Sequence, residues 1–437
     1  AAADFLIQLR DQAQDANERK ELNRLIGDCY FLNEDYANAV DFYQAARQRE
    51  VGVDADGNLF LRLIAAEVRA GEIDSAMQHI DEADFGGYVN VSDRWRAEWS
   101  VARALLAAGK QAVALERVRY LVTESAADSV PLSLNLRLRW LEARLSLFSG
   151  EVDGVLERVD ALLARIESVP ASRLDVSDTR LLLTEMLLLK ASILIDQSAG
   201  AEGLVVLTQL RSDYPDSSAA ARSFIVEGNY HASIGDLEAA QNALLGLAQA
   251  YRTSQLAPKA IFEAAVYAER RGPDFYAEAI RIHNELTDRY PRNQLVFTAR
   301  LRQGDLLRQM NDLAGAQIVY ENLINNFPDH PRRYVAELSR ADCMLALAKQ
   351  NATQLQDVSL ALERLIDLPN LPVDVQIEVG YKWGFSLVQR SENEEAVEVF
   401  TLMLTRFLLG DEPAPDLGPI GRYWMSRLLL ELGGALE

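Results

Sequence analysis

Residues 303–328 read QGDLLRQMNDLAGAQIVYENLINNFP, and the spacing of their small and large residues recurs elsewhere in the chain. The same residue types stand at matching offsets in residues 26–46 (IGDCYFLNEDYANAVDFYQAA), 227–247 (EGNYHASIGDLEAAQNALLGL) and 383–400 (WGFSLVQRSENEEAVEVF). The offsets are counted from the first glycine of each unit, which is Gly27, Gly228, Gly304 or Gly384. Agreement at four separate places indicates a structural repeat.

The pattern predicts two helices that cross closely. Gly304 lies in the first helix, and Ala316, twelve residues later, is the opposing small residue in the second. Tyr320 then fills the space beside the crossing. A polar turn separates the two helices, as in NED (33–35), IGD (234–236) and MND (310–312). Pro328 ends the second helix, because proline cannot continue it.

Helix-favouring residues with apolar spacings of three and four dominate the chain, and no alternating strand pattern stands out, so the fold class is all-α. Weaker units have their first small position near Ile64, Ala102, Ala143, Ala191, Ala264 and Ala341. Together these units predict about ten helix pairs in a single solenoid over residues 1–437. Val155 and Gly203 replace the expected alanine. The less regular region near 150–205 leaves open a division into halves 1–170 and 171–437.

The repeat resembles the tetratricopeptide repeat, whose pattern places Trp, Leu, Gly and Tyr in the first helix and Ala, Phe, Ala and Pro in the second. The resemblance covers nearly the whole chain. It implies a right-handed superhelix whose first helices line a concave groove. DYPDSSAAARSFIVEGNY, DRYPRNQLVFTARLRQGDLL and NFPDHPRRYVAELSRADCM are further similar to tetratricopeptide proteins of the Gram-negative envelope. Those proteins include outer-membrane assembly lipoproteins and periplasmic cell-division coordinators, which are non-enzymatic adaptors.

Composition narrows the classes of function. The formal net charge of −21 argues against nucleic-acid binding and favours basic or neutral partners. Two cysteines and four scattered histidines offer no metal-ligand spacing, and no catalytic or cofactor-binding motif is recognisable. The most apolar stretch, LLLTEMLLLKASILI (181–195), is interrupted by Glu185 and Lys190 and is too short to span a bilayer.

The strongest candidate site is an eight-residue sequence pattern that occurs twice in the chain. RAEWSVAR (96–103) and RLRWLEAR (137–144) are separated by 41 residues, counted as 137 − 96, and occupy equivalent positions in successive first helices. Stacking would bring these positions together. The predicted groove residues are Arg96, Trp99, Arg103, Arg137, Trp140 and Arg144. Such a cluster would bind a carboxylate or an acidic peptide.

The tryptophans and the arginines each have a structural role as the alternative to partner binding. Trp99 and Trp140 are alternatively core residues packed against the preceding repeat. The arginines are alternatively neutralised by Glu98, Glu142 and residues of nearby helices. Tyr381 and Phe385, in YKWGF (381–385), form a second groove candidate. Trp383 is expected to pack in the core, because consecutive residues cannot all face one side of a helix.

These observations predict a non-enzymatic scaffold that binds a protein or peptide partner in its groove, with a role in bacterial envelope assembly. The alternative is a regulatory or substrate-delivery segment of a larger enzyme or secretion protein. The resemblance places the chain in the periplasm or at the outer membrane, with a lipid anchor or a membrane-protein partner outside this sequence. A cytoplasmic location is the alternative.

Overall fold

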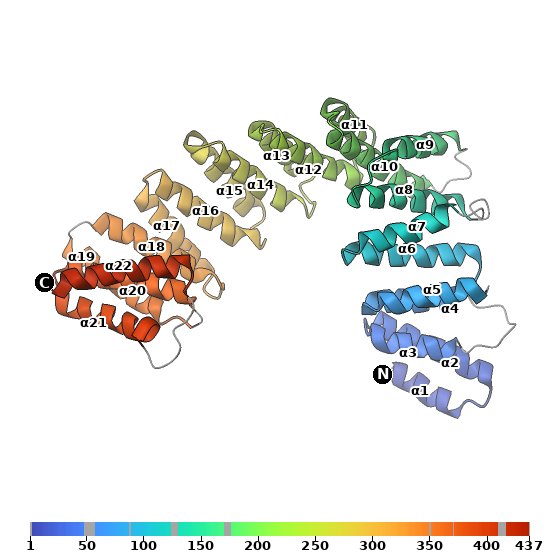
Figure 1. Cartoon of the computed structure of the whole chain (residues 1–437), viewed down its shortest axis with the longest axis horizontal. Helices are drawn as coiled ribbons and strands as arrows, with labels where there is room; N and C mark the ends of the chain where they lie inside the picture. The colour runs from blue at the N-terminus through green and yellow to red at the C-terminus, as the bar shows by residue number, and fades with distance from the viewer. Residues whose placement is uncertain are drawn as a thin grey trace. The chain divides into compact units, whose positions relative to one another are not determined.

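The computed structural model describes residues 2–47, 57–86, 89–123, 130–169, 176–348, 351–369, 371–409 and 417–436. These residues are almost entirely helical, and no strand occurs among them. The all-α prediction is therefore confirmed. The twenty helices from α2 to α21 follow one another as ten consecutive pairs, flanked by α1 and α22. Consecutive helices pack side by side from α1 to α11 and from α13 to α22, as expected for stacked helix pairs (Figure 1).

Contacts divide the chain into two compact units, Ala1–Ser223 and Phe224–Glu437. The predicted boundary between residues 170 and 171 lies outside the described residues, and the single-solenoid arrangement stays a prediction. Unit 1 contains α1 (Ala2–Gln12), α2 (Ala16–Leu32), α3 (Tyr36–Ala46), α4 (Gly57–Ala70), α5 (Ile73–Gly86), α6 (Val91–Ala107), α7 (Gln111–Thr123), α8 (Leu132–Phe148), α9 (Val155–Ser168), α10 (Val176–Asp196) and α11 (Gly200–Asp213).

The unit boundary falls within α12 (Ser218–Ser233). Unit 2 continues with α13 (Leu237–Ala250), α14 (Ala257–Arg270), α15 (Tyr276–Arg289), α16 (Leu295–Gln309), α17 (Leu313–Asn326), α18 (Arg333–Ala348), α19 (Ala352–Ile366), α20 (Val373–Gln389), α21 (Asn393–Leu404) and α22 (Pro419–Leu436). A short 3-10 helix precedes α15 and a π-helical turn follows α21. None of the described helices combines the length and the apolar character needed to cross a membrane.

The predicted turns between paired helices share one local conformation. Glu34, Gly235 and Asn311 have positive φ angles of 62°, 84° and 63°. In each turn the next residue is an aspartate whose side chain accepts a hydrogen bond from the backbone three residues later. This N-cap satisfies a backbone N–H group that the first turn of the second helix leaves unpaired. The turn therefore reverses the chain and starts the second helix within three residues.

The helix crossings are as tight as the sequence predicts. A Cβ atom built on Gly27 would lie 2.6 Å from the Tyr43 ring. The same addition at Gly304 or Gly384 would collide with the ring of Tyr320 or Phe400. Ala39, Ala240, Ala316 and Ala396 are all fully buried, which confirms the predicted phase of the repeat.

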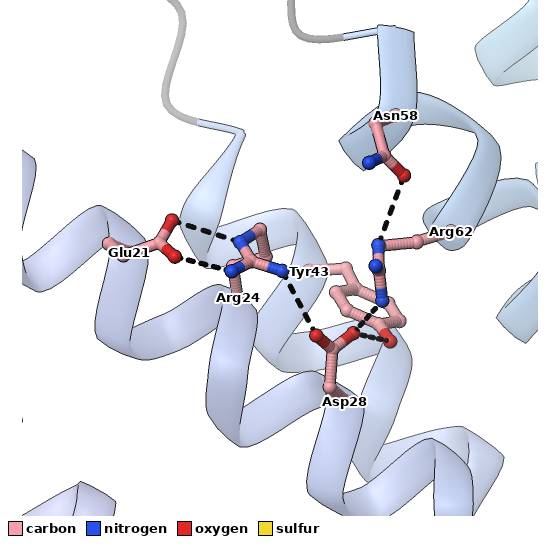
Figure 2. A network of polar contacts seen from close by, with 6 residues as sticks. All are labelled: Glu21, Arg24, Asp28, Tyr43, Asn58 and Arg62. Atoms are coloured by element: carbon pink, nitrogen blue, oxygen red, sulfur yellow. Dashed lines mark hydrogen bonds and ion pairs between the residues drawn. The ribbon is translucent and has the colours of Figure 1, made fainter.

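A polar network joins the first pair to the next helix (Figure 2). Tyr43 in α3 donates a hydrogen bond of 2.7 Å to Asp28 in α2. Arg62 in α4 forms an ion pair with the same carboxylate, and Arg24 donates to its other oxygen at 3.0 Å. Burial and the neighbouring Asp28 raise the pKa of Tyr43, so the phenol stays protonated as the donor.

Unit 2 contains a similar polar network. Tyr320 in α17 donates a hydrogen bond of 2.7 Å to Asp305 in α16. Arg308 lies 3.6 Å from Asp305 and 3.4 Å from Asp342 in α18. Lys382 in α20 forms an ion pair of 2.5 Å with Asp342. Opposite charges therefore link successive first helices in both units.

We predict that Ala316→Leu lowers the free energy of unfolding by about 1–3 kcal/mol, because the added carbons must enter a filled crossing. Urea denaturation followed by circular dichroism measures the change. Ala314→Leu is the matched control, since Ala314 lies on the same helix and is exposed. Equal stability of the two variants would contradict the assigned phase.

Tyr43→Phe and Tyr320→Phe should each lower stability by about 1–2 kcal/mol, because each removes a hydrogen bond to a carboxylate. Tyr36→Phe serves as the control, since its ring packs edge-on against Phe31 and its hydroxyl has no described hydrogen bond. The same denaturation experiment tests all three variants. Unchanged stability of both test variants would show that the phenol groups act only by filling space.

Candidate partner-binding site

The two candidate stretches lie in α6 and α8, the first helices of successive pairs in unit 1. Asn90 caps α6 by accepting a hydrogen bond of 2.9 Å from the backbone of Asp93. Pro131 precedes α8 and suits the start of a helix. The two helices contact each other, so equivalent residues of the duplicated pattern lie on neighbouring turns.

The two tryptophans meet. The ring centroids of Trp99 and Trp140 are 6.2 Å apart, and the rings are tilted by 39°. Both side chains are half-buried and pack against the core of unit 1, whereas Trp95 in α6 is completely buried. One part of each ring therefore packs in the core and the remainder is accessible, and the groove role of Trp99 and Trp140 stays a prediction.

An arginine lies over each ring. The guanidinium of Arg103 is 5.8 Å from the Trp99 centroid, and that of Arg144 is 5.4 Å from the Trp140 centroid. Arg144 also lies 5.6 Å from the exposed ring of Phe148. These distances suit cation–π interactions, which hold each guanidinium in place without neutralising its charge.

The two arginines also affect each other electrostatically. Burial lowers the pKa of Arg144, and the positive charges of Arg222 and Arg103 lower it further, while Glu185 opposes them. The guanidinium remains charged at any physiological pH. Arg103 forms no ion pair with a described residue. An external anion would therefore relieve repulsion at this point.

The first arginine of each stretch, Arg96 or Arg137, has a different environment from the last. Arg96 is exposed and forms an ion pair of 3.0 Å with Asp93, one turn earlier on the same helix. Arg137 is half-buried and already interacts with other described parts of the chain. Arg103 and Arg144 therefore lie over the tryptophan rings, whereas no described contact joins Arg96 to either ring.

The carboxylates named in the structural alternative have other partners. Glu98 accepts two hydrogen bonds from Arg117 in α7, at 2.9 and 2.7 Å. Burial raises the pKa of Glu98, although Arg117 opposes the change. Glu142 pairs with Arg119 and Arg158, each at 3.3 Å. Arginines of second helices therefore occupy both carboxylates, and neither forms a described ion pair with Arg103 or Arg144.

The structure adds three residues that the sequence analysis did not select. Phe148 lies beside Arg144, while Glu185 in α10 forms an ion pair with Arg222 in α12. Glu185 follows Arg144 by 41 residues, the same interval that separates Arg144 from Arg103 (185 − 144 and 144 − 103). This spacing is the signal that would have placed Glu185 on the same face.

The second candidate, Tyr381 and Phe385, lies beneath the last helix. Tyr381 is 4% exposed, and its hydroxyl accepts a hydrogen bond of 2.9 Å from Arg427 in α22. Its ring lies 5.1 Å from Trp424 and 6.0 Å from the half-buried Phe385. Trp383 is partly buried against the core of unit 2. In this arrangement α22 covers Tyr381, and a binding role for the pair stays a prediction.

No group of three metal-ligating side chains occurs within the described ranges. Cys29 and Cys343 are free thiols. Cys343 is fully buried, and burial raises its pKa, so its thiol is protonated and poorly reactive.

Comparison with known families supports the repeat assignment. Residues 298–330, which include the crossing of α16 and α17, match the family model described as a tetratricopeptide repeat. This match supports the prediction of a tetratricopeptide-repeat protein. No curated protein sequence matches the chain.

Three solved structures show some similarity. Yeast Tom70 has 11% identity and a TM-score of 0.34, with 97% of this chain and 96% of that chain covered. A tetratricopeptide repeat protein from Parabacteroides merdae has 12% identity and a TM-score of 0.32, with coverage of 67% and 98%. The C-terminal part of a TPR repeat-containing protein from Cytophaga hutchinsonii has 11% identity and a TM-score of 0.39, with coverage of 74% and 98%. These values are too low to transfer a partner or an activity.

We predict that Glu98→Gln lowers the free energy of unfolding by about 1–3 kcal/mol, because Arg117 loses a charged acceptor in a mostly buried position. Thermal and urea denaturation measure the effect. Glu116→Gln is the control, since Glu116 is exposed on α7 and has no described ion pair. Equal stability of the Glu98→Gln and Glu116→Gln variants would contradict the structural role of Glu98.

Proposed function

We propose that this chain is a non-enzymatic interaction scaffold that binds an acidic segment of a partner protein through unit 1. The binding surface is the arginine–tryptophan patch, defined as Arg96, Trp99, Arg103, Arg137, Trp140 and Arg144. A tetratricopeptide-type fold is generally a protein–protein interaction scaffold, which supports the proposed class of function.

One observation carries the proposal: the contact between α6 and α8 brings like charges together, whereas ion pairs join several other successive first helices. Ion pairs join α2 to α4, α10 to α12, and α18 to α20. Between α6 and α8, Arg103 and Arg144 instead bring two positive charges into each other's field. Arg103 and Arg144 form no ion pair with a described residue, although Glu185 in α10 partly offsets the positive charges that act on Arg144, and an acidic partner would supply these ion pairs.

The aromatic rings give the patch a second property. Trp99 and Trp140 form a half-buried apolar surface between the guanidinium groups. Rings of this kind provide contact area at little cost in conformational entropy, and tryptophan and arginine are enriched among residues that dominate binding. A segment with both a carboxylate and an apolar side chain therefore fits the patch better than a uniformly acidic one.

We further propose that this scaffold acts in bacterial envelope assembly, in the periplasm or at the outer membrane. The support is the pattern of aromatic residue, proline, polar turn and spaced alanines at the end of several repeats. A lipid anchor or a membrane-protein partner would then tie it to the membrane. A cytoplasmic scaffold is the competing proposal, and fractionation of native cells distinguishes the two.

Arg103→Gln combined with Arg144→Gln should abolish or strongly weaken partner binding, because it removes both central charges. The matched control combines Arg69→Gln with Arg165→Gln, which changes net charge equally at two exposed positions of unit 1. Wild-type and variant proteins are used as bait in native cell extract, and captured proteins are identified by mass spectrometry. Partners lost only with the test variant are then titrated at increasing salt concentration.

The expected signature is a loss of affinity and of its salt dependence, with a melting temperature close to that of the wild type. Capture of the same proteins by both variants would overturn the assignment of the site. A large fall in melting temperature with unchanged binding would make these arginines structural.

A further inference from the structure

A second surface in unit 2 has the opposite character. A hollow of about 360 Å³ lies between the second helices α19 and α21, with the first helix α20 as its floor. This volume is near the lower end of the range found for ligand pockets. The hollow shares no residue with the arginine–tryptophan patch and belongs to the other compact unit.

Apolar side chains form the floor and parts of both walls. Leu360 on α19 is 41% exposed and Leu402 on α21 is 54% exposed, although both are large aliphatic residues. Between them lie the half-buried Trp383 and the buried Val399. Single exposed leucines are common on protein surfaces, but here two of them face one hollow with an indole below.

The rim is acidic. Glu363 on α19 and both Glu395 and Glu398 on α21 line the hollow and are exposed. None of these three forms an ion pair or hydrogen bond with a described residue. Arg390 is the basic residue of the lining, and it is held by Glu392 at 2.7 Å. The hollow therefore presents carboxylates without local counter-charge on both sides of an apolar strip.

We propose that this groove, defined by Leu360, Glu363, Trp383, Glu395, Glu398 and Leu402, binds a basic amphipathic helix of a protein partner. The groove is bounded by two helices, and a third helix can place its side-chain ridges between them. Apolar residues of the ligand would cover Leu360, Trp383 and Leu402. Lysine or arginine on its two flanks would pair with the glutamates. This inference is independent of the proposed function, because it concerns a different unit and the opposite sign of charge.

The test uses the full chain and two labelled synthetic helical peptides of about 18 residues, long enough to form a helix in water. The first carries leucines at helical spacing with lysines on both flanks. The second has every lysine replaced by glutamate. Fluorescence anisotropy measures binding of each peptide at low salt and at physiological salt. The lysine peptide should bind, and the glutamate peptide should not.

Charge reversal alone would not locate the site, because a chain of net charge −21 attracts many basic peptides. The test variant combines Glu363→Gln with Glu398→Gln. The control combines Glu321→Gln on α17 with Glu394→Gln on α21, two exposed glutamates outside the groove. Both variants change net charge by the same amount. The test pair should weaken binding about tenfold and the control pair much less.

A third variant, Leu402→Ala, tests the apolar wall without altering charge. It should also weaken the lysine peptide, whereas Val205→Ala, at an exposed position on α11 in unit 1, should not. Circular dichroism checks that all variants remain folded. Equal weakening by the two glutamate pairs, or no effect of Leu402→Ala, would overturn the proposal. So would binding of a lysine peptide whose leucines are scrambled out of helical spacing.

Discussion

At three helix crossings the packing of an aromatic ring against a glycine sets the geometry of the helix pair. Tyr43 lies against Gly27, Tyr320 against Gly304 and Phe400 against Gly384, and a Cβ atom on any of these glycines would collide with the ring. The contact fixes both the distance and the rotation of the second helix relative to the first. In two of the crossings the ring is a tyrosine, so the same contact also positions a hydroxyl group beside the next aspartate in the first helix.

That aspartate extends the constraint from one pair to the next. Asp28 is held by Tyr43 and pairs with Arg62 in the following first helix. In unit 2 the link is indirect: Arg308 lies near Asp305, which Tyr320 holds, and reaches Asp342 in the following first helix, which pairs in turn with Lys382. Glu269 and Arg302 form a further link of this type between α14 and α16. These ion pairs are partly exposed, so each contributes little energy by itself. Their effect is positional: they set the register between neighbouring first helices, and surface residues at equivalent positions then become neighbours.

The predictable part of the structure consists of contacts within one repeat and contacts between equivalent positions of adjacent repeats. The spacing of Gly304, Ala316 and Tyr320 predicted the helix crossing, and the buried alanines confirm its phase. The contact between the rings of Trp99 and Trp140 was predictable, because the two residues occupy equivalent positions in successive first helices. The covering of Tyr381 by α22 was not, because α22 lies outside the repeated pairs and the repeat pattern does not say which residues of α20 it covers. The partners of Glu98 and Glu142 were also missed, since long side chains from several helices compete for one carboxylate.

The contrast between neighbouring contacts explains how a repetitive fold acquires particular sites. Where α10 meets α12, Glu185 and Arg222 form an ion pair. Where α6 meets α8, the equivalent face carries Arg103 and Arg144, while Glu98 and Glu142 are occupied by arginines of the second helices. A difference in the sign of one residue at a repeated position therefore distinguishes an ion-paired contact from one that leaves Arg103 and Arg144 without an ion pair to a described residue. The backbone need not change, because the crossing that orients both helices involves none of these charges. A solenoid can in this way vary its partners while its stacking remains the same.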